Sequence, residues 1–475
     1  MRSSSILGVL SILLALSAVP GCESQARPPF LVRLVDGQGV NPVPDIEANL
    51  TVTVLQAIVG EDGDTTRIID GTFELDVPIA AYDLNTALSA RITPVGDSEL
   101  IGATVAFAPF GYSTGVHIVM GRPGTCLPLT APRLDGARLL PGLVLVRADL
   151  VGIGGARSGG TVRSVDLYSP LNLTTDLFSG TIGDLASDGF GRTRTAKIDD
   201  TLILAIDGSH AITYDAGGGS VVMARDTEIT LHGGANTLSA IAELGDEGVA
   251  VVGGHDDDDA VPAISVVRSV TTVDRSHMLS FARAGASAAR FGRGILVAGG
   301  QTDGEPLFEW ISIDGTIDNV SFGDAEPARS GGALVVSLGG ASAFYYLGRA
   351  SDGSLPDTTY LISGCPAACI ATVSTPALHP RFEPAIAMRA TAAVVLGGFD
   401  VGGFATATVE EVRFVGSSAS VVALGDLSSA RADTAVVTLG GGTVLVAGGQ
   451  GTSNVLDSME LCFPEELDPL IVPGG

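Results

Sequence analysis

Six histidines are the side chains best suited to acid–base or metal chemistry in this sequence. They are His117, His210, His232, His255, His277 and His379. No two of them are spaced as in the H-x-H or H-x-x-x-H patterns that bring two imidazoles to one ion. We therefore interpret them as loop and surface residues, and expect no catalytic residue, no cofactor and no metal site.

Two acidic runs, 255–259 and 61–64, could in principle hold Ca²⁺. Neither has the D-x-D-x-D-G register that wraps oxygen ligands round one ion, and adjacent residues of an extended run point in opposite directions. We interpret the first as a solvated loop and the second as a turn. The glycine triplets 217–219 and 440–442 do not precede helices, which favours turns over phosphate cradles.

The N-terminal residues form a candidate targeting signal. Arg2 precedes a largely apolar run over residues 6–19, which is too short to span a bilayer and of the size of a signal-peptide core. The run ends at Val19-Pro20-Gly21-Cys22 and resembles a bacterial lipoprotein signal, with an aliphatic residue at −3 and Gly at −1. The resemblance implies cleavage before Cys22 and attachment of lipid to that cysteine.

The alternative is an ordinary secretory signal that leaves Cys22 as a thiol. The number of cysteines favours lipidation, because removing Cys22 from the five leaves an even set suited to an oxidising compartment: Cys126, Cys365, Cys369 and Cys462. Glu23 follows the cysteine, where Asp would mark retention at the inner membrane. We expect a lipid anchor in the cell envelope, with the outer membrane favoured.

Composition excludes several classes of protein. The 475 residues are 45% hydrophobic and only 17% charged, which is too apolar for a disordered chain. Basic residues number 26 against 53 acidic, for a net charge of −27. This balance would repel phosphates, so we expect no nucleic-acid partner.

After a signal peptide (1–21) and a tether (22–29), residues 30–120 alternate short strand patterns with turn formers. We expect strands over 30–35, 50–58, 72–77, 88–92, 103–108 and 116–120. Residues 51–54 and 90–93 alternate apolar and polar side chains, as half-buried strands do. About 90 residues of this kind predict a small β-sandwich, loosely immunoglobulin-like.

Beyond residue 121 the sequence repeats. An apolar strand ending in Gly-Gly recurs five times, with first glycines at 154, 253, 299, 397 and 448. The gaps are 99, 46, 98 and 51 residues, so two gaps are double the others. Degenerate copies fill both, at 202–208 and 344–349. An arginine precedes the strand-ending glycine of most copies: Arg194, Arg283, Arg329, Arg381 and Arg431.

A period near 50 residues with several strands per repeat is typical of a β-propeller. The array over residues 122–465 resembles bacterial propellers of the kelch and galactose-oxidase type. The row Leu427-Ser428-Ser429-Ala430-Arg431, the glycine-ended strand 444–449 and residues 458–461 carry the resemblance. The chain departs from the kelch pattern in having one Trp, Trp310, and in keeping the repeat's Tyr clearly only at Tyr168 and Tyr360. We expect an all-β fold: a sandwich, a propeller of seven blades or alternatively six, and a C-terminal tail (466–475).

The strand pattern also pairs the cysteines. The last repeat ends on a third strand, and residues 125–129 fall where its fourth strand should be. Cys126 and Cys462 would then lie on neighbouring antiparallel strands, close enough for a disulfide. Cys365 and Cys369 would close a tight loop between two strands of one repeat.

The expected function is that of a lipid-anchored envelope protein whose propeller binds or scaffolds a protein or a glycan without catalysis. The alternative is a propeller enzyme acting on carbohydrate, as an oxidase or a glycan-modifying enzyme. Galactose-oxidase-type enzymes need two Tyr and two His round copper and a Cys cross-linked to one Tyr. No matching set can be recognised in this sequence.

Overall fold

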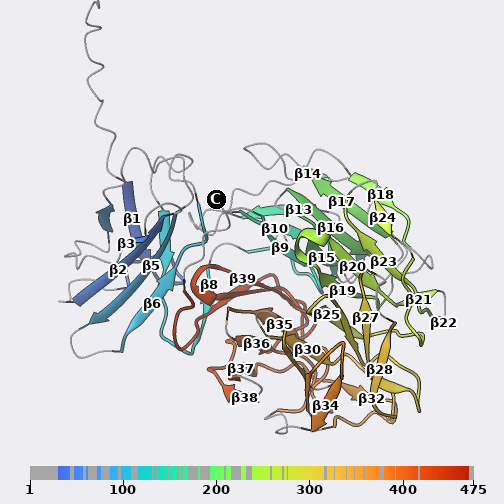
Figure 1. Cartoon of the computed structure of the whole chain (residues 1–475). Coiled ribbons are helices and arrows are strands. Elements are labelled where there is room, and N and C mark those ends of the chain that lie inside the picture. Colours follow the sequence, from blue (N-terminus) through green and yellow to red (C-terminus); the bar gives the residue numbers. More distant parts are fainter. Residues whose placement is uncertain are drawn as a thin grey trace, which may run out of the picture.

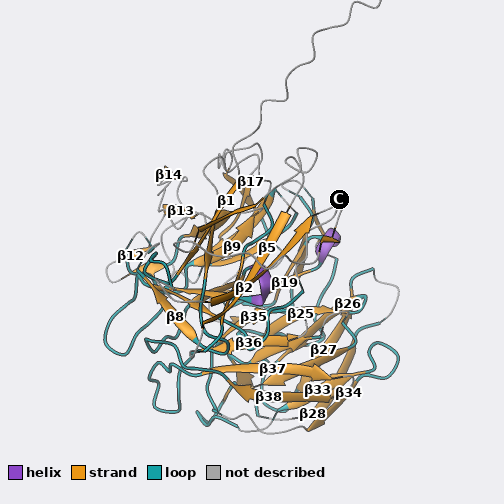
Figure 2. Cartoon of the chain, turned by 90° about the vertical axis from the view of Figure 1, so that its left-hand side faces the viewer, coloured by secondary structure: helices purple, strands orange, loops and turns teal. Residues whose placement is uncertain are grey.

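The computed structural model describes residues 30–469 except for short gaps. The gaps are 43–47, 57–59, 62–71, 76–85, 95–97, 108–115, 131–132, 135, 147–148, 158–159, 162–163, 169–179, 182–192, 200, 208–209, 216–225, 232–237, 257–258, 270–271, 275, 315–317, 326, 338–339, 347, 357–358, 374–378, 391 and 416–417. The described residues form strands joined by loops, with single turns of 3₁₀ helix at η3 (Gly245–Glu247) and η4 (Gly440–Gly442) (Figure 2). The expected all-β class is confirmed.

The N-terminal domain consists of two sheets, drawn in blue and cyan in Figure 1. One has the order β4-β1-β7, and the other β3-β2-β5-β6. The strands are β1 (Phe30–Val35), β2 (Ala48–Gln56), β3 (Gly60–Glu61), β4 (Thr72–Leu75), β5 (Thr86–Pro94), β6 (Leu100–Ala103) and β7 (Val116–Val119). The expected strand over 103–108 lies earlier, as β6, because Ser89–Ile92 of β5 pair with residues 100–103.

The rest of the chain forms a β-propeller, and Figure 1 shows its sheets following one another round a ring from teal to red. Within the described residues the ring contains seven four-stranded antiparallel sheets, named here by their innermost strands. The β9 blade is β9 (Gly142–Val146), β10 (Asp149–Ile153), β13 (Ser164–Tyr168) and β14 (Gly180–Thr181). The β15 blade is β15 (Arg194–Lys197), β16 (Leu202–Asp207), β17 (His210–Asp215) and β18 (Asp226–Ile229). The β19 blade is β19 (Ala240–Glu243), β20 (Val249–Val252), β23 (Ile264–Val267) and β24 (Val273–Asp274).

Four more blades complete the ring. The β25 blade is β25 (Ser287–Phe291), β26 (Gly294–Ala298), β27 (Pro306–Ser312) and β28 (Val320–Ala325). The β30 blade is β30 (Ala333–Val336), β31 (Ser342–Tyr346), β33 (Tyr360–Ser363) and β34 (Ile370–Val373). The β35 blade is β35 (Ala385–Met388), β36 (Ala392–Leu396), β37 (Val409–Val415) and β38 (Ser418–Ala423). The β39 blade is β39 (Ala435–Thr438), β40 (Val444–Ala447), β41 (Met459–Cys462) and, from the other end of the array, β8 (Cys126–Leu129).

The ring closes at the β39 blade, as the sequence predicted. Strand β8 pairs antiparallel with β41, and the register sets Cys126 opposite Cys462. These two cysteines form a disulfide that spans 336 residues of sequence. Innermost strands β39 and β9 contact each other, so the last blade packs against the first. The second predicted disulfide, Cys365–Cys369, joins the ends of β33 and β34.

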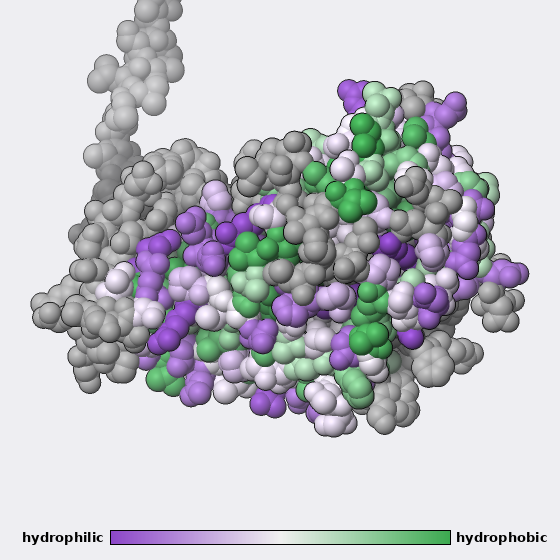
Figure 3. Space-filling view, turned by 90° about the horizontal axis from the view of Figure 1, so that it is seen from below, coloured by the Kyte–Doolittle hydropathy of each residue, from purple (hydrophilic) through white to green (hydrophobic). Residues whose placement is uncertain are grey.

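Apolar residues lie on both faces of each blade because each blade is packed between two neighbours. One cluster joins the β25 and β30 blades through Phe308, Trp310 and Tyr345. Another joins the β35 and β39 blades through Leu396, Val409 and Val446. Burial on both faces explains the high fraction of hydrophobic residues in the chain. On the surface, hydrophilic and hydrophobic residues are interspersed (Figure 3). Both degenerate repeats are second strands, β16 and β31.

The N-terminal domain packs against the junction of the β39 and β9 blades. Val35, Ile101 and Val119 share a buried cluster with Leu445 and Tyr168 of the propeller. The glycine triplet 440–442 forms η4, and a Cβ at Gly440 would overlap the carbonyl of Thr104 in the N-terminal domain. The triplet is therefore a turn, as expected, and it permits close approach of two backbones. No described helix is long and apolar enough to cross a membrane.

Candidate functional site

The repeated glycines mark one face of the propeller, called here the glycine face. In each blade the innermost strand begins on this face and the second strand ends there, as the pairing of Ala435 with Ala447 illustrates. The Gly-Gly pairs adopt positive φ, for example 64° at Gly448 and 101° at Gly449. These values suit glycine, because a Cβ is disfavoured in the left-handed region.

Buried arginines hold this face together. They stand four positions ahead of the innermost strand, at Arg138, Arg283, Arg329, Arg381 and Arg431. Arg283 donates to the carbonyl of Gly299 at 2.8 Å, and Arg431 donates to that of Gly448 at 2.9 Å. These two guanidinium groups thus bind the glycine turn of their own blade, whereas Arg381 donates to the carbonyl of Val395 at 3.1 Å.

One arginine of the predicted series, Arg194, does not belong to this set. It is the first residue of β15 and is partly exposed, and in the sequence the position four residues ahead of β15 is a phenylalanine, Phe190. Arg138 belongs in its place: it is fully buried and donates to Gly154 at 3.3 Å. The separation of 16 residues between Arg138 and Gly154 could have identified it in the sequence.

Buried glutamates on third strands pair with three of these arginines, and sequence reasoning missed all of them. Glu460 accepts hydrogen bonds from Arg431 at 2.7 and 3.0 Å. Glu410 lies 3.0 Å from Arg381, and Glu309 lies 3.7 Å from Arg283. Burial works against both charges of a pair, raising the pKa of Glu410 and lowering the pKa of Arg381. A glutamate in an otherwise apolar strand was the available signal.

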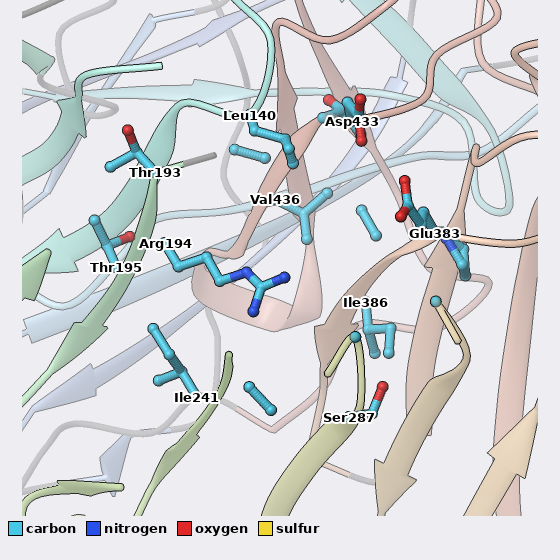
Figure 4. Close-up of a pocket in the computed structure, with 18 of the residues that line it drawn as sticks. Leu140, Thr193, Arg194, Thr195, Ile241, Ser287, Glu383, Ile386, Asp433 and Val436 are labelled. Carbon is cyan, nitrogen blue, oxygen red and sulfur yellow. The ribbon is translucent and has the colours of Figure 1, made fainter. Parts of the chain in front are cut away.

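An axial cavity of about 390 Å³ lies among the innermost strands on the glycine face. All the innermost strands contribute to its wall, which is built largely of small residues such as Ala240, Ala286 and Ala435. Among the described residues of the wall, the charged ones are Arg194, Glu383 and Asp433. Figure 4 shows the Arg194 side chain extending into the middle of the cavity, with Glu383 and Asp433 on the wall.

The mouth of this cavity is framed by residues in the left-handed conformation. They stand two positions ahead of the innermost strands: Leu140, Leu238, Gly285, Gly331, Glu383 and Asp433. Their amides link adjacent blades, since Gly331 donates to Gly285 at 3.0 Å and Glu383 donates to Gly331 at 2.7 Å. Glu383 and Asp433 have φ of 51° and 50°, where a side chain costs about 1 kcal/mol relative to glycine.

The described residues of the cavity wall offer hydrogen-bonding groups. Ser287 lines it, but the hydroxyl donates to the carbonyl of Gly332. None of the described histidines is part of its wall. The carboxylates of Glu383 and Asp433 can accept hydrogen bonds from a ligand, and Arg194 can donate them.

The predicted candidates for metal binding stay apart. Described histidines are separated: His277 lies 3.4 Å from Asp274, and His379 lies 3.1 Å from Glu410. The acidic run 255–259 is not a plain loop but the short hairpin of β21 (His255–Asp256) and β22 (Asp259–Ala260). In the part of the chain that the structure describes, no cluster of three potential metal ligands is found.

Some candidates lie outside the described residues: Cys22 with the signal peptide, His232, the triplet 217–219 and positions 62–64. A motif that sequence reasoning missed, Gly111-Tyr112-Ser113-Thr114-Gly115, has the G-x-S-x-G form and also lies outside them. The nucleophile motif of that form needs a helix directly after it. Here strand β7 begins at Val116, so the context does not fit.

Comparison with known proteins gives a fold likeness only. No protein-family model matches the chain, and no curated protein matches it. Among solved structures it is similar to one described as "Structure of YjhT", with a TM-score of 0.42 and 13% sequence identity over 56% of this chain and 93% of that chain. The sheet topology of the chain itself identifies an all-β protein with a β-propeller.

Proposed function

We propose that this chain is a non-catalytic binding module that takes a hydroxyl-rich ligand, such as the end of a glycan, into the axial cavity. The observation that carries the proposal is the wall of that cavity, where Arg194, Glu383 and Asp433 face a space of about 390 Å³. That volume lies within the range of small-ligand sites, about 300–1,000 Å³.

The charged side chains suit hydroxyl groups. A carboxylate accepts hydrogen bonds from two hydroxyls, and a guanidinium donates to ring and hydroxyl oxygens. Glu383 and Asp433 also keep the left-handed conformation at a cost in stability, although Gly285 and Gly331 show that glycine fits equivalent positions. Strained residues that persist at a cavity mouth support a role in binding.

We also propose that lipid on Cys22 attaches the protein to the envelope, with the outer membrane favoured. The signal over residues 6–22 supports this. The tether (22–29) leads directly into β1, so the N-terminal domain would act as the spacer between the lipid and the propeller.

A glycan-array screen tests the binding proposal. We expect the full chain to bind a defined set of glycans, and Asp433→Asn to weaken binding about tenfold, because it removes a charged acceptor. Asparagine tolerates the left-handed conformation, so the fold should persist. Asp318→Asn is the matched control, since Asp318 is exposed on the opposite face. Absence of glycan binding, or equal binding by both variants, would contradict the proposal.

Metal analysis of the same preparation tests the enzyme alternative. We expect less than stoichiometric copper. Stoichiometric copper together with a radical-type absorbance would overturn the non-catalytic assignment.

Anchoring is tested separately by Cys22→Ser. We expect the variant to leave the membrane fraction and to lose labelling by tritiated palmitate, because the thiol that carries the lipid is gone. Labelling at the wild-type level would refute the anchor and leave the binding proposal untouched.

A further inference from the structure

The axial cavity continues into a second hollow on the face opposite the glycine face. This second hollow, called here the far hollow, has a volume of about 810 Å³, about twice that of the axial cavity. Its wall includes the ends of five innermost strands, β15, β19, β25, β30 and β35. Neighbouring strands of this series contact each other round the axis of the ring (Figure 1).

The two hollows adjoin each other. In β35 the axial cavity is lined by Ala385 and the far hollow by Met388, three residues further along, which is about 10 Å in an extended strand. The residues between these ends line both hollows: Thr195, Ile241, Ala288, Leu334 and Ile386. The hollows are therefore consecutive parts of one channel along the axis.

The wall of this channel carries polar backbone groups because the innermost strands are edge strands. In the described sheets each innermost strand pairs with a second strand on one side only, so N–H and C=O groups of its other edge face the axis. Side chains meet some of these groups, since the Thr195 hydroxyl donates to the carbonyl of Leu143 at 3.2 Å and the Ser287 hydroxyl to that of Gly332.

The backbone edges favour a hydroxyl-rich occupant over an alkyl chain. An alkyl chain would bury N–H and C=O groups without giving them partners, which is costly. Sugar hydroxyls both donate and accept hydrogen bonds, so they can pair with either kind of group. The same chemistry therefore extends from the axial cavity into the far hollow.

The far hollow adds exposed polar side chains of its own. Glu243 accepts a hydrogen bond from the amide of Lys197 at 2.9 Å, and a carboxylate has sites for several more. Arg290 lies 3.6 Å from Glu247, and its guanidinium has five N–H donors. Met388, which is 42% exposed, offers an apolar surface for the C–H groups of a sugar ring.

We propose that the ligand is a linear oligosaccharide that runs along the axis through both hollows. This inference rests on the proposed binding of a glycan end in the axial cavity. The end unit of the oligosaccharide occupies the axial cavity, and the following units occupy the far hollow beside Glu243 and Arg290. A single sugar unit uses only the first part of the channel, so affinity should rise with chain length.

The test is calorimetric titration of the full chain with β-1,4-linked oligomers of glucose and of N-acetylglucosamine, each from one to six units long. We expect the Kd to fall at least about tenfold between one unit and six units in the series that binds. Equal affinities for one and six units would overturn this inference and leave the proposed binding in the axial cavity standing. No saturable binding by either series would overturn the inference. Tighter binding of octyl β-glucoside than of the six-unit chains would also overturn it, because the far hollow would then take an alkyl chain.

Variants separate the two hollows. Glu243→Gln should weaken binding of the six-unit chain about fivefold without changing that of the single unit, because it replaces a charged acceptor in the far hollow but keeps an oxygen for the Lys197 amide. Glu466→Gln is the matched control, since Glu466 is exposed and lies in neither wall.

Met388→Trp should fill part of the far hollow and bring the affinity for six units close to that for one. Asp433→Asn, in the axial cavity, should weaken binding of both lengths equally. Loss of binding in Asp433→Asn with no length-dependent change in Met388→Trp and Glu243→Gln would overturn this inference while supporting the proposed function.

Discussion

The β39 and β30 blades are built on the same plan, but they differ at three corresponding features. The β39 blade has a disulfide that joins residues 336 apart, whereas the disulfide of the β30 blade joins residues 4 apart. The buried arginine meets Glu460 in the first and Tyr360 in the second. The left-handed residue two positions ahead of the innermost strand is Asp433 in the first blade and Gly331 in the second.

The differences change what surrounds the buried arginine of each blade. In the β39 blade, Glu460 accepts hydrogen bonds from Arg431 and from the amides of Ser428 and Ser429, so it joins the third strand to the loop that carries the arginine. The blade that closes the ring is thus joined both by a long-range disulfide and by this hydrogen-bond network. In the β30 blade the guanidinium of Arg329 lies over the Tyr360 ring, and that of Arg349 lies over the Phe382 ring.

The largest expected effect comes from removing the ring-closing disulfide. Cys126→Ala with Cys462→Ala should lower the free energy of unfolding by about 5 kcal/mol. Without the disulfide, the unfolded chain regains the conformational entropy that closure of a long loop had removed. Cys365→Ala with Cys369→Ala should cost about 2 kcal/mol by the same reasoning. Urea unfolding of both double variants measures the contrast. Equal losses would show that the two disulfides do not differ through loop length.

The next effect concerns the buried arginines. Glu460→Gln should destabilise the fold by about 3 kcal/mol, since it leaves the charge of Arg431 buried without its carboxylate. Tyr360→Phe should cost less than about 1 kcal/mol, because the ring beneath Arg329 is kept. Thermal and urea unfolding check both values. A loss for Tyr360→Phe as large as that for Glu460→Gln would contradict the proposed difference between the blades.

The smallest effect is expected at the cavity mouth. Asp433→Gly should raise the free energy of unfolding by about 1 kcal/mol, because glycine adopts φ of 50° without strain. The same variant should lose glycan binding in the axial cavity. Gly331→Ala should destabilise, since a Cβ there would lie 2.7 Å from the Glu383 side chain. A stability unchanged or lowered in Asp433→Gly would show that the aspartate carries no strain.

Much of the architecture could be predicted because a repeat leaves several copies of one signal. The spacing of the Gly-Gly pairs located the second strands, including the degenerate copies β16 and β31. The missing fourth strand of the last repeat placed Cys126 beside Cys462. One copy of the signal was misleading: Arg194 has the right spacing from a glycine but is the first residue of β15, so the strand starts four residues earlier than an equivalence with Arg283 requires.

The sequence by itself determined the strand order, the closure of the ring and both disulfides, because each depends on periodicity and on local pairing. Only the tertiary structure decided which residues meet. The pairing of Arg431 with Glu460 and of Arg329 with Tyr360 depends on strand register, which brings together residues about 30 apart in sequence that carry no common spacing motif. The axial cavity joins Arg194, Glu383 and Asp433 from different blades, and no local sequence pattern records the curvature that makes them neighbours.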